Sequence, residues 1–127
     1  MNPLNIESTY YTPKVDFDPA NGILVIEGRV LETDKGNDED TFTKISGWVD
    51  SYFRDKKGPM LIKFRLSYYN TTSSKKMVKF MRSLDTLFIK GQDVKIVWEY
   101  DDGDEDALTD GEVFKKLFSV PFNIVKT

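Results

Sequence analysis

The chain has 127 residues, of which 39% are hydrophobic and 13% aromatic, enough to bury one core without disulfides or a metal. It contains no cysteine and no histidine, which excludes thiol nucleophiles, cysteine metal sites and the usual general base near neutral pH. The formal net charge of −3 offers nucleic acid no general attraction, so the expected ligand is a protein. We therefore expect a single domain over residues 1–127 that uses no cofactor.

No apolar run approaches the length of a membrane-spanning helix, and the first residues lack the basic-then-apolar order of a secretory signal. We therefore expect a cytosolic protein that binds no membrane. Without a secretory signal, the glycosylation pattern at Asn70-Thr71-Thr72 is interpreted as a coincidence.

The first predicted element is a β-hairpin. Residues 14–18 and 23–30 are β-like and rich in branched and aromatic side chains. Between them, Asn21-Gly22 supplies the positive φ that a tight turn needs.

An amphipathic helix is predicted after a polar, acidic stretch from Glu32 to Asp40. Its apolar residues recur at intervals of three and four and so line one face: Phe42, Ile45, Trp48, Val49, Tyr52 and Phe53. Asp40 and Thr41 are the alternative N-caps, and Lys56-Lys57-Gly58-Pro59 ends the helix.

A strand over residues 61–69 and a second helix form the centre of the chain. The strand places Ile62, Phe64, Leu66 and Tyr68 on one face and Lys63, Arg65 and Ser67 on the other. This alternation predicts a sheet covered by helices on one side only. The helix that follows carries an apolar stripe of Met77, Phe80, Met81, Leu84, Leu87 and Phe88, and Gly91 ends it.

In the last third of the sequence we predict a strand over residues 93–100, a helix and a final strand over 122–125. Thr109 and Glu112 match a capping box for the helix, with an earlier start near Asp104 as the alternative. Pro121 terminates this helix. The resulting order, β-β-α-β-α-β-α-β, predicts an α/β fold with a mixed sheet whose later strands are parallel.

The acidic run from Asp101 to Glu112 has the length of a calcium-binding EF-hand loop. Gly103 occupies its third position, and Asp106 its sixth, where a glycine is required. We interpret the run as a solvated loop and expect no metal site. Nor does any spacing select a catalytic pair among the 21 acidic residues, so we expect no enzyme.

The most informative stretch is the junction between the central strand and its helix, Asn70-Thr71-Thr72-Ser73-Ser74. All five residues are of types favoured near helix N-termini, so a capping role accounts for one of them. Capping needs one side chain, whereas the junction supplies an asparagine and four hydroxyls, followed by Lys75, Lys76 and Lys79. A regulatory phosphorylation site explains the surplus, because lysines can steady added negative charge.

Tyrosines occur in two pairs, Tyr10-Tyr11 and Tyr68-Tyr69, which raises the alternative of an RNA-binding sheet face. The acidic balance argues against it. Phe80, Phe88, Trp48 and Trp98 also fall at positions that face the core. We therefore expect no nucleic-acid partner.

One stretch reads LSYYNTTSSKKM between an alternating strand and an amphipathic helix, and VKIVWEYDDGDED and SVPFNIV follow later. This arrangement resembles the SiaC family of bacterial regulatory phosphoproteins, from the segment Thr12-Pro13 to Val120-Pro121-Phe122. Its most specific part is the pattern of Tyr68, Asn70 and Thr71.

The resemblance implies a fold similar to the STAS domain of anti-sigma-factor antagonists, with a phosphorylated residue at the start of the helix. By motif that residue is Thr71, and a shift along the cluster would nominate Thr72 or Ser73. In such families a protein kinase adds the phosphate and a PP2C-type phosphatase removes it. In the SiaC family the target can be a diguanylate cyclase, activated by the unphosphorylated form.

We therefore predict a non-enzymatic partner-switching protein controlled by phosphorylation at Thr71. The predicted partner-binding surface consists of Asn70, Thr72, Ser73, Ser74, Lys75, Lys76 and Lys79. Two alternatives remain: a STAS-like antagonist in a stress or transcription partner switch, and a small carboxylate- or lysine-dependent enzyme. Which hydroxyl takes the phosphate and which residue caps the helix are left open by the sequence.

Overall fold

The computed structural model describes residues 3–31, 41–55 and 58–127. One sheet of six strands follows the order of the chain: β1 (Leu4–Ile6), β2 (Lys14–Asp18), β3 (Ile23–Val30), β4 (Met60–Tyr69), β5 (Val94–Tyr100) and β6 (Phe122–Lys126). The first three strands pair in antiparallel fashion, and β3 to β6 are parallel. Parallel neighbours need a crossover connection, and three helices supply it: α1 (Thr41–Asp55), α2 (Thr71–Ile89) and α3 (Glu105–Leu117).

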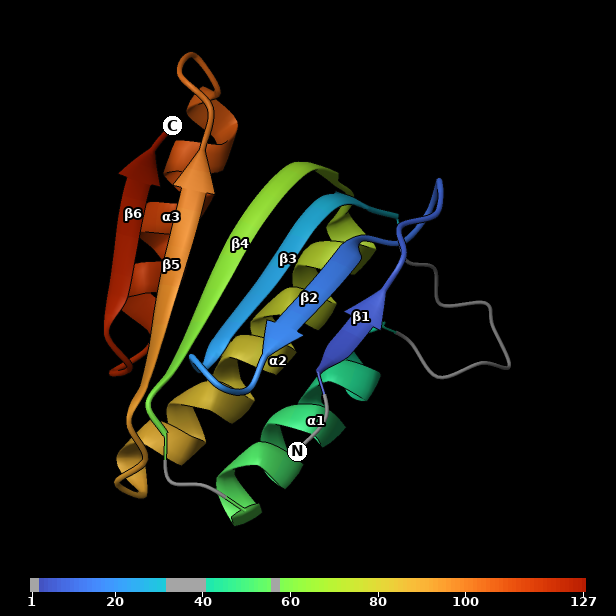
Figure 1. Ribbon diagram of the computed structural model, residues 1–127. Coiled ribbons are helices and arrows are strands. Elements are labelled where there is room, and N and C mark those ends of the chain that lie inside the picture. Colours follow the sequence, from blue (N-terminus) through green and yellow to red (C-terminus); the bar gives the residue numbers. More distant parts are fainter. Residues whose placement is uncertain (1–2, 32–40, 56–57) are drawn as a thin grey trace.

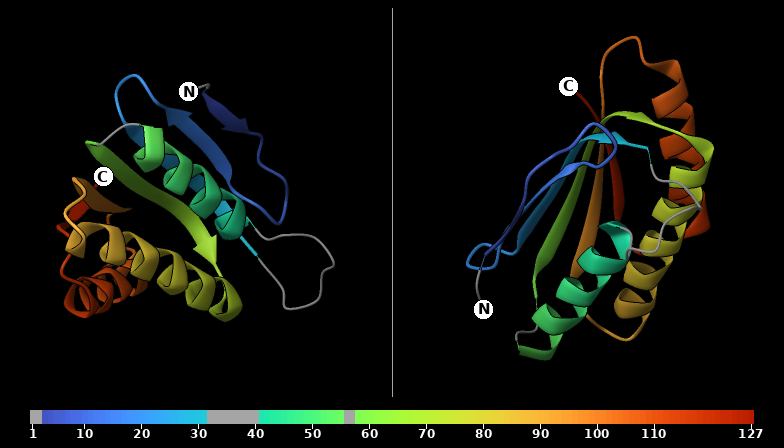
Figure 2. Two further views of the ribbon diagram at one scale, coloured as in Figure 1. Left: turned by 90° about the horizontal axis from the view of Figure 1, so that it is seen from below. Right: turned by 90° about the vertical axis from the view of Figure 1, so that its right-hand side faces the viewer.

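All three helices cover the same face of the sheet, as Figures 1 and 2 show. Alternate side chains of the central strands enter the core on that side, among them Ile62, Phe64, Ile96 and Trp98. Lys63 and Arg65 project from the opposite, uncovered face. The predicted one-sided sheet is therefore confirmed. No helix in the described ranges is long and apolar enough to cross a membrane.

The hairpin, the three helices and the three later strands are confirmed, including the apolar stripe of α2. Gly91 follows α2 with φ 100°, and its N–H donates to the Phe88 carbonyl. The stretch from Glu32 to Asp40, the alternative N-cap Asp40, and Lys56-Lys57 of the proposed helix end lie outside the described residues.

Two predictions about element bounds need correction. The three-residue strand β1 was not predicted; it is too short to show an alternation of its own, and its pairing with β2 defines it. Helix α3 begins at Glu105, so the alternative start is right and the capping box at Thr109 is wrong. Asp104 is the N-cap, because its carboxylate accepts the Ala107 N–H at 3.1 Å.

The predicted inward orientation of Tyr68 is also wrong, because a bulge interrupts β4. Gly28 pairs with Leu66 and Arg29 with Tyr68, so Ser67 has no partner on β3. One extra residue shifts the alternation by one position. Tyr68 is therefore 58% exposed, while the ring of Tyr69 turns inward and packs 5.7 Å from that of Trp98.

Candidate functional site

The junction between β4 and α2 is capped by Asn70. Its backbone is extended, and its side-chain oxygen accepts the Ser73 N–H at 2.8 Å. The Asn70 carbonyl accepts the Ser74 N–H at 2.9 Å, which is the first hydrogen bond of the helix. The cap is thus the asparagine, and none of the four hydroxyls is needed for it.

Ser73 has a structural partner on another strand. Its side chain is fully buried, and its hydroxyl donates to the Val30 carbonyl at 2.7 Å. Val30 is the last residue of β3, so this bond ties the first turn of α2 to the end of the neighbouring strand. The Ser73 hydroxyl is therefore shielded from solvent in this conformation.

Thr71, unlike the buried Ser73, is exposed to solvent. It is the first residue of α2 and is exposed, whereas Thr72 and Ser74 are half-buried. Within the part of the chain that the structure describes, the Thr71 side chain makes no hydrogen bond. The first turn of α2 holds no acidic residue, so the positive end of the helix dipole faces Thr71 without a compensating side chain from that turn.

The predicted lysines divide between two faces of α2. Lys75 follows Thr71 by four residues and so shares its face, and both are exposed. Lys76 and Lys79 instead line a groove of about 310 Å³ between α2 and α1. The groove also includes Phe42 and Phe80. The predicted surface is therefore a junction with two sides rather than one continuous face.

The α3 side of the junction contains a polar contact that the sequence did not predict. The Tyr69 hydroxyl donates to the Asp110 carboxylate at 2.5 Å. Burial, and then the hydrogen bond and charge of Asp110, raise the pKa of Tyr69 well above its ordinary value. A hollow of about 350 Å³ surrounds this pair; we call it the acidic hollow, and Tyr68, Asp104 and Asp106 help to line it.

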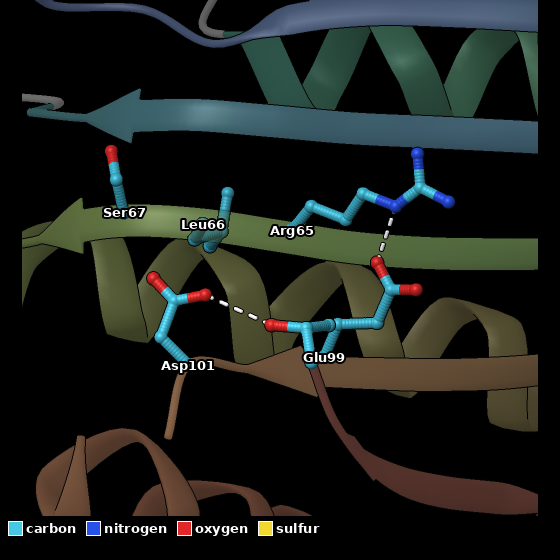
Figure 3. Close-up of a pocket in the computed structure, with 6 residues that line it drawn as sticks. Arg65, Leu66, Ser67, Glu99 and Asp101 are labelled. Carbon is cyan, nitrogen blue, oxygen red and sulfur yellow. Dashed lines mark hydrogen bonds and ion pairs between the residues drawn. The ribbon is translucent and has the colours of Figure 1, made fainter. Parts of the chain in front are cut away.

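A second hollow lies on the uncovered face of the sheet, at the carboxyl ends of β4 and β5 (Figure 3). It measures about 330 Å³, and the Arg65 side chain reaches across to pair with Glu99. The charges of Arg65 and Glu99 thus neutralise each other, and the carboxylate of Asp101, which also lines the hollow, accepts the Thr127 hydroxyl. The described residues hold no group of three acidic side chains placed to bind a metal ion.

Comparison with a family model and with solved structures gives the same family. The model of the SiaC family regulatory phosphoproteins matches residues 6–127. An uncharacterised protein of Pseudomonas aeruginosa (strain UCBPP-PA14) is 30% identical over 98% of this chain and 96% of its own length.

Two solved structures resemble the fold closely. SiaC of Pseudomonas aeruginosa is 28% identical with a TM-score of 0.84 over the whole of both chains. SiaC in the crystal structure of diguanylate cyclase SiaD in complex with its activator SiaC, also from Pseudomonas aeruginosa, is 29% identical. Its TM-score is 0.85 over 98% of this chain and 99% of that chain. The chain therefore belongs to the SiaC family of regulatory phosphoproteins.

Proposed function

We propose that this protein is a non-enzymatic switch in which reversible phosphorylation of Thr71 controls the binding of a diguanylate cyclase. The unphosphorylated form binds and activates the cyclase. A protein kinase and a PP2C-type phosphatase set the balance between the two forms. The observation that carries the proposal is the exposure of Thr71 at the start of α2, beside an asparagine and a serine that are already hydrogen-bonded.

The family supports the cyclase as the target. The relative SiaC is described as the activator of the diguanylate cyclase SiaD and has been crystallised in complex with it. This chain has the same fold over 98% of its length. A regulatory role by binding agrees with the absence of histidine and cysteine from the sequence.

The proposed modification needs no rearrangement of the junction. The kinase transfers the terminal phosphoryl group of ATP to Thr71 Oγ1, and ADP and a proton are released; the phosphatase returns the hydroxyl by hydrolysis to inorganic phosphate. The phosphate adds about −1.5 to −2 charges at pH 7. At a helix N-terminus this charge is stabilised by about 0.3–1 kcal/mol, so α2 stays folded. Lys75, one turn further, adds attraction.

The neighbouring hydroxyls are less suitable acceptors. Phosphorylation of Ser73 would require its bond to the Val30 carbonyl to break and its buried side chain to become accessible. Thr72 is half-buried. Thr71 alone combines exposure with the first position of the helix, which favours it over both neighbours.

Site mapping tests the acceptor. Wild type, Thr71→Ala and Thr72→Ala are incubated with the cognate kinase and ATP, and intact mass and peptide fragmentation locate the phosphate. We expect one phosphate on wild type and on Thr72→Ala, and none on Thr71→Ala. A phosphate retained by Thr71→Ala at the wild-type rate would refute Thr71 as the acceptor.

A further inference from the structure

Exposed aromatic side chains gather at the carboxyl ends of β3 and β4, the edge of the sheet from which α2 begins. Tyr10, Tyr11 and Tyr68 are 64%, 61% and 58% exposed. Together with Arg29 they form what we call the tyrosine surface. Tyr10 and Tyr11 belong to the connection between β1 and β2, and Arg29 and Tyr68 are paired residues of β3 and β4.

The tyrosine surface is held in place although it is exposed. The Thr9 hydroxyl oxygen accepts the N–H groups of Tyr11 and Thr12, at 3.1 Å and 3.0 Å. The Tyr11 carbonyl accepts the Leu31 N–H at 2.8 Å, which fixes the connection to the end of β3. The Arg29 guanidinium lies 4.8 Å from the centre of the Tyr10 ring. A connection whose backbone is fixed in this way loses less entropy when a partner covers it.

The tyrosine surface adjoins the proposed switch. Tyr68 precedes Thr71 by three residues, and Val30, next to Arg29, accepts the hydrogen bond of Ser73 in the first turn of α2. Figure 1 shows the β1–β2 connection, the carboxyl ends of β3 and β4, and the start of α2 at one edge of the molecule. A protein that covers the tyrosine surface would therefore also reach Thr71.

The composition of the tyrosine surface is typical of binding rather than of folding. Single exposed apolar side chains are ordinary on a protein surface. Tyrosine and arginine, however, are enriched among the residues that dominate binding energy at protein interfaces. Here three tyrosines and an arginine are exposed together, and the core does not need any of them.

The charges on the two sides of Thr71 have opposite signs. On one side, the basic residues are Arg29 of β3 and Lys75 of α2, and both are exposed. On the other side, the acidic hollow that Tyr68 borders contains Asp104 and Asp106. Opposite charges at two ends of an interface fix the orientation of a partner more than they add to its affinity.

We propose that the tyrosine surface docks the target protein of the switch, and this proposal rests on the proposed function. The target segment that fits presents apolar side chains to Tyr10, Tyr11 and Tyr68. It places a carboxylate near Arg29 and an arginine or lysine in the acidic hollow. A phosphate on Thr71 would lie beneath this segment, where it repels the carboxylate and must be desolvated, so the modified form releases the target.

A binding experiment with purified diguanylate cyclase tests the docking surface. The unphosphorylated chain is compared with a double variant, Tyr10→Ala with Tyr11→Ala, and with Ile89→Ala as the matched control. Ile89 is 68% exposed but lies at the far end of α2 from Thr71, about 27 Å away at 1.5 Å per residue. We expect the double variant to bind at least tenfold more weakly and Ile89→Ala to bind within twofold of wild type.

A second pair of variants tests the proposed orientation of the target segment on the tyrosine surface. Arg29→Glu and Asp106→Lys are each expected to weaken binding at least fivefold, whereas Lys115→Glu, near the end of α3, is expected to leave it unchanged. Circular dichroism and urea unfolding of each variant confirm that the fold is retained. Wild-type affinity in both charge variants would overturn the proposed orientation.

The outcomes separate this proposal from the one on which it rests. If wild type binds the cyclase and the double tyrosine variant binds equally well, the docking surface is wrong and the proposed function stands. If the double variant binds normally but is phosphorylated more slowly, the tyrosine surface serves the kinase, which also overturns the proposal. If unphosphorylated wild type does not bind the cyclase, both proposals fail.

Discussion

Among single residues, Ser73 has the clearest structural role at the junction. Its buried hydroxyl is the donor that satisfies the Val30 carbonyl. Replacement by alanine would leave that carbonyl without this partner, so Ser73→Ala should lower the free energy of unfolding by about 1–3 kcal/mol. Urea unfolding measures the change. Ser74→Ala is the control, since Ser74 is half-buried and should change stability by less than about 0.5 kcal/mol. Equal stability of the two variants would contradict the role assigned to Ser73.

Tyr69 gives a prediction about pH. Its pKa is raised in the folded protein, first by burial and then by Asp110. The folded pKa lies above the unfolded value of about 10, so the stabilisation is complete below pH 10 and is lost as the pH rises further.

Tyr69→Phe removes both the hydroxyl and its titration. The variant should be less stable than wild type by about 1–2 kcal/mol at pH 7, because a hydrogen bond to a charged group is lost. Above pH 10 this difference should shrink as wild type loses stability. Urea unfolding at pH 7 to 11 tests both statements, with the exposed Tyr11→Phe as the control. A difference that stays constant with pH would refute the link to Tyr69 ionisation.

Among the elements, α3 packs against the sheet through a glycine. A β-carbon at Gly111 would lie 2.6 Å from Cδ1 of Trp98. The indole ring is 1% exposed, and its N–H donates to the Ala107 carbonyl at 2.9 Å, so it has little room to move. Gly111→Ala should therefore lower the free energy of unfolding by about 1–3 kcal/mol.

Gly47 offers the opposite case within α1. It is exposed, and a β-carbon there would meet nothing within 4 Å. Gly47→Ala should raise the free energy of unfolding by about 0.5–1 kcal/mol, because alanine favours the helix. The thermal unfolding temperature should therefore fall in Gly111→Ala and rise in Gly47→Ala. A shift in the same direction would show that the packing against Trp98 does not control the docking of α3.

The sequence predicts these elements well where one period dominates. The stripe of α2 and the alternation of β5 follow directly from burial on one face. The sequence predicts the structure poorly where pairing with a distant segment of the chain determines it. The bulge at Ser67 depends on the register with β3, and a local pattern cannot contain that register. The start of α3 was ambiguous because Asp104 and Thr109 are both good N-caps.

The same distinction applies to the candidate site. The sequence locates the junction because Asn70 to Ser74 are neighbours in the chain. It cannot locate Arg29 and Tyr10 beside them, because strand pairing and the β1–β2 connection bring those residues together. It also cannot rank the hydroxyls, since the burial of Ser73 depends on the carbonyl of Val30.

At the scale of the whole molecule, Thr71 and the tyrosine surface lie outside the hydrophobic core. The helices and the inward face of the sheet hold the core, and Figure 1 shows the carboxyl ends of β3 and β4 and the start of α2 at one edge of the molecule. The tyrosine surface and the acidic hollow adjoin this edge. A phosphate at this edge alters the charge of a surface without touching the core. The switch is therefore expected to change affinity while leaving the fold unchanged.

The most direct test is the affinity of purified diguanylate cyclase for the unphosphorylated chain and for the chain phosphorylated stoichiometrically at Thr71, with cyclase activity measured in parallel. We predict that phosphorylation weakens binding by about 5- to 100-fold, equivalent to about 1–3 kcal/mol, and lowers activation at matched concentration to the extent that binding is lost. Thr71→Ala should bind like the unphosphorylated protein and resist the kinase. Equal affinity and equal activation by the two forms would contradict the switch.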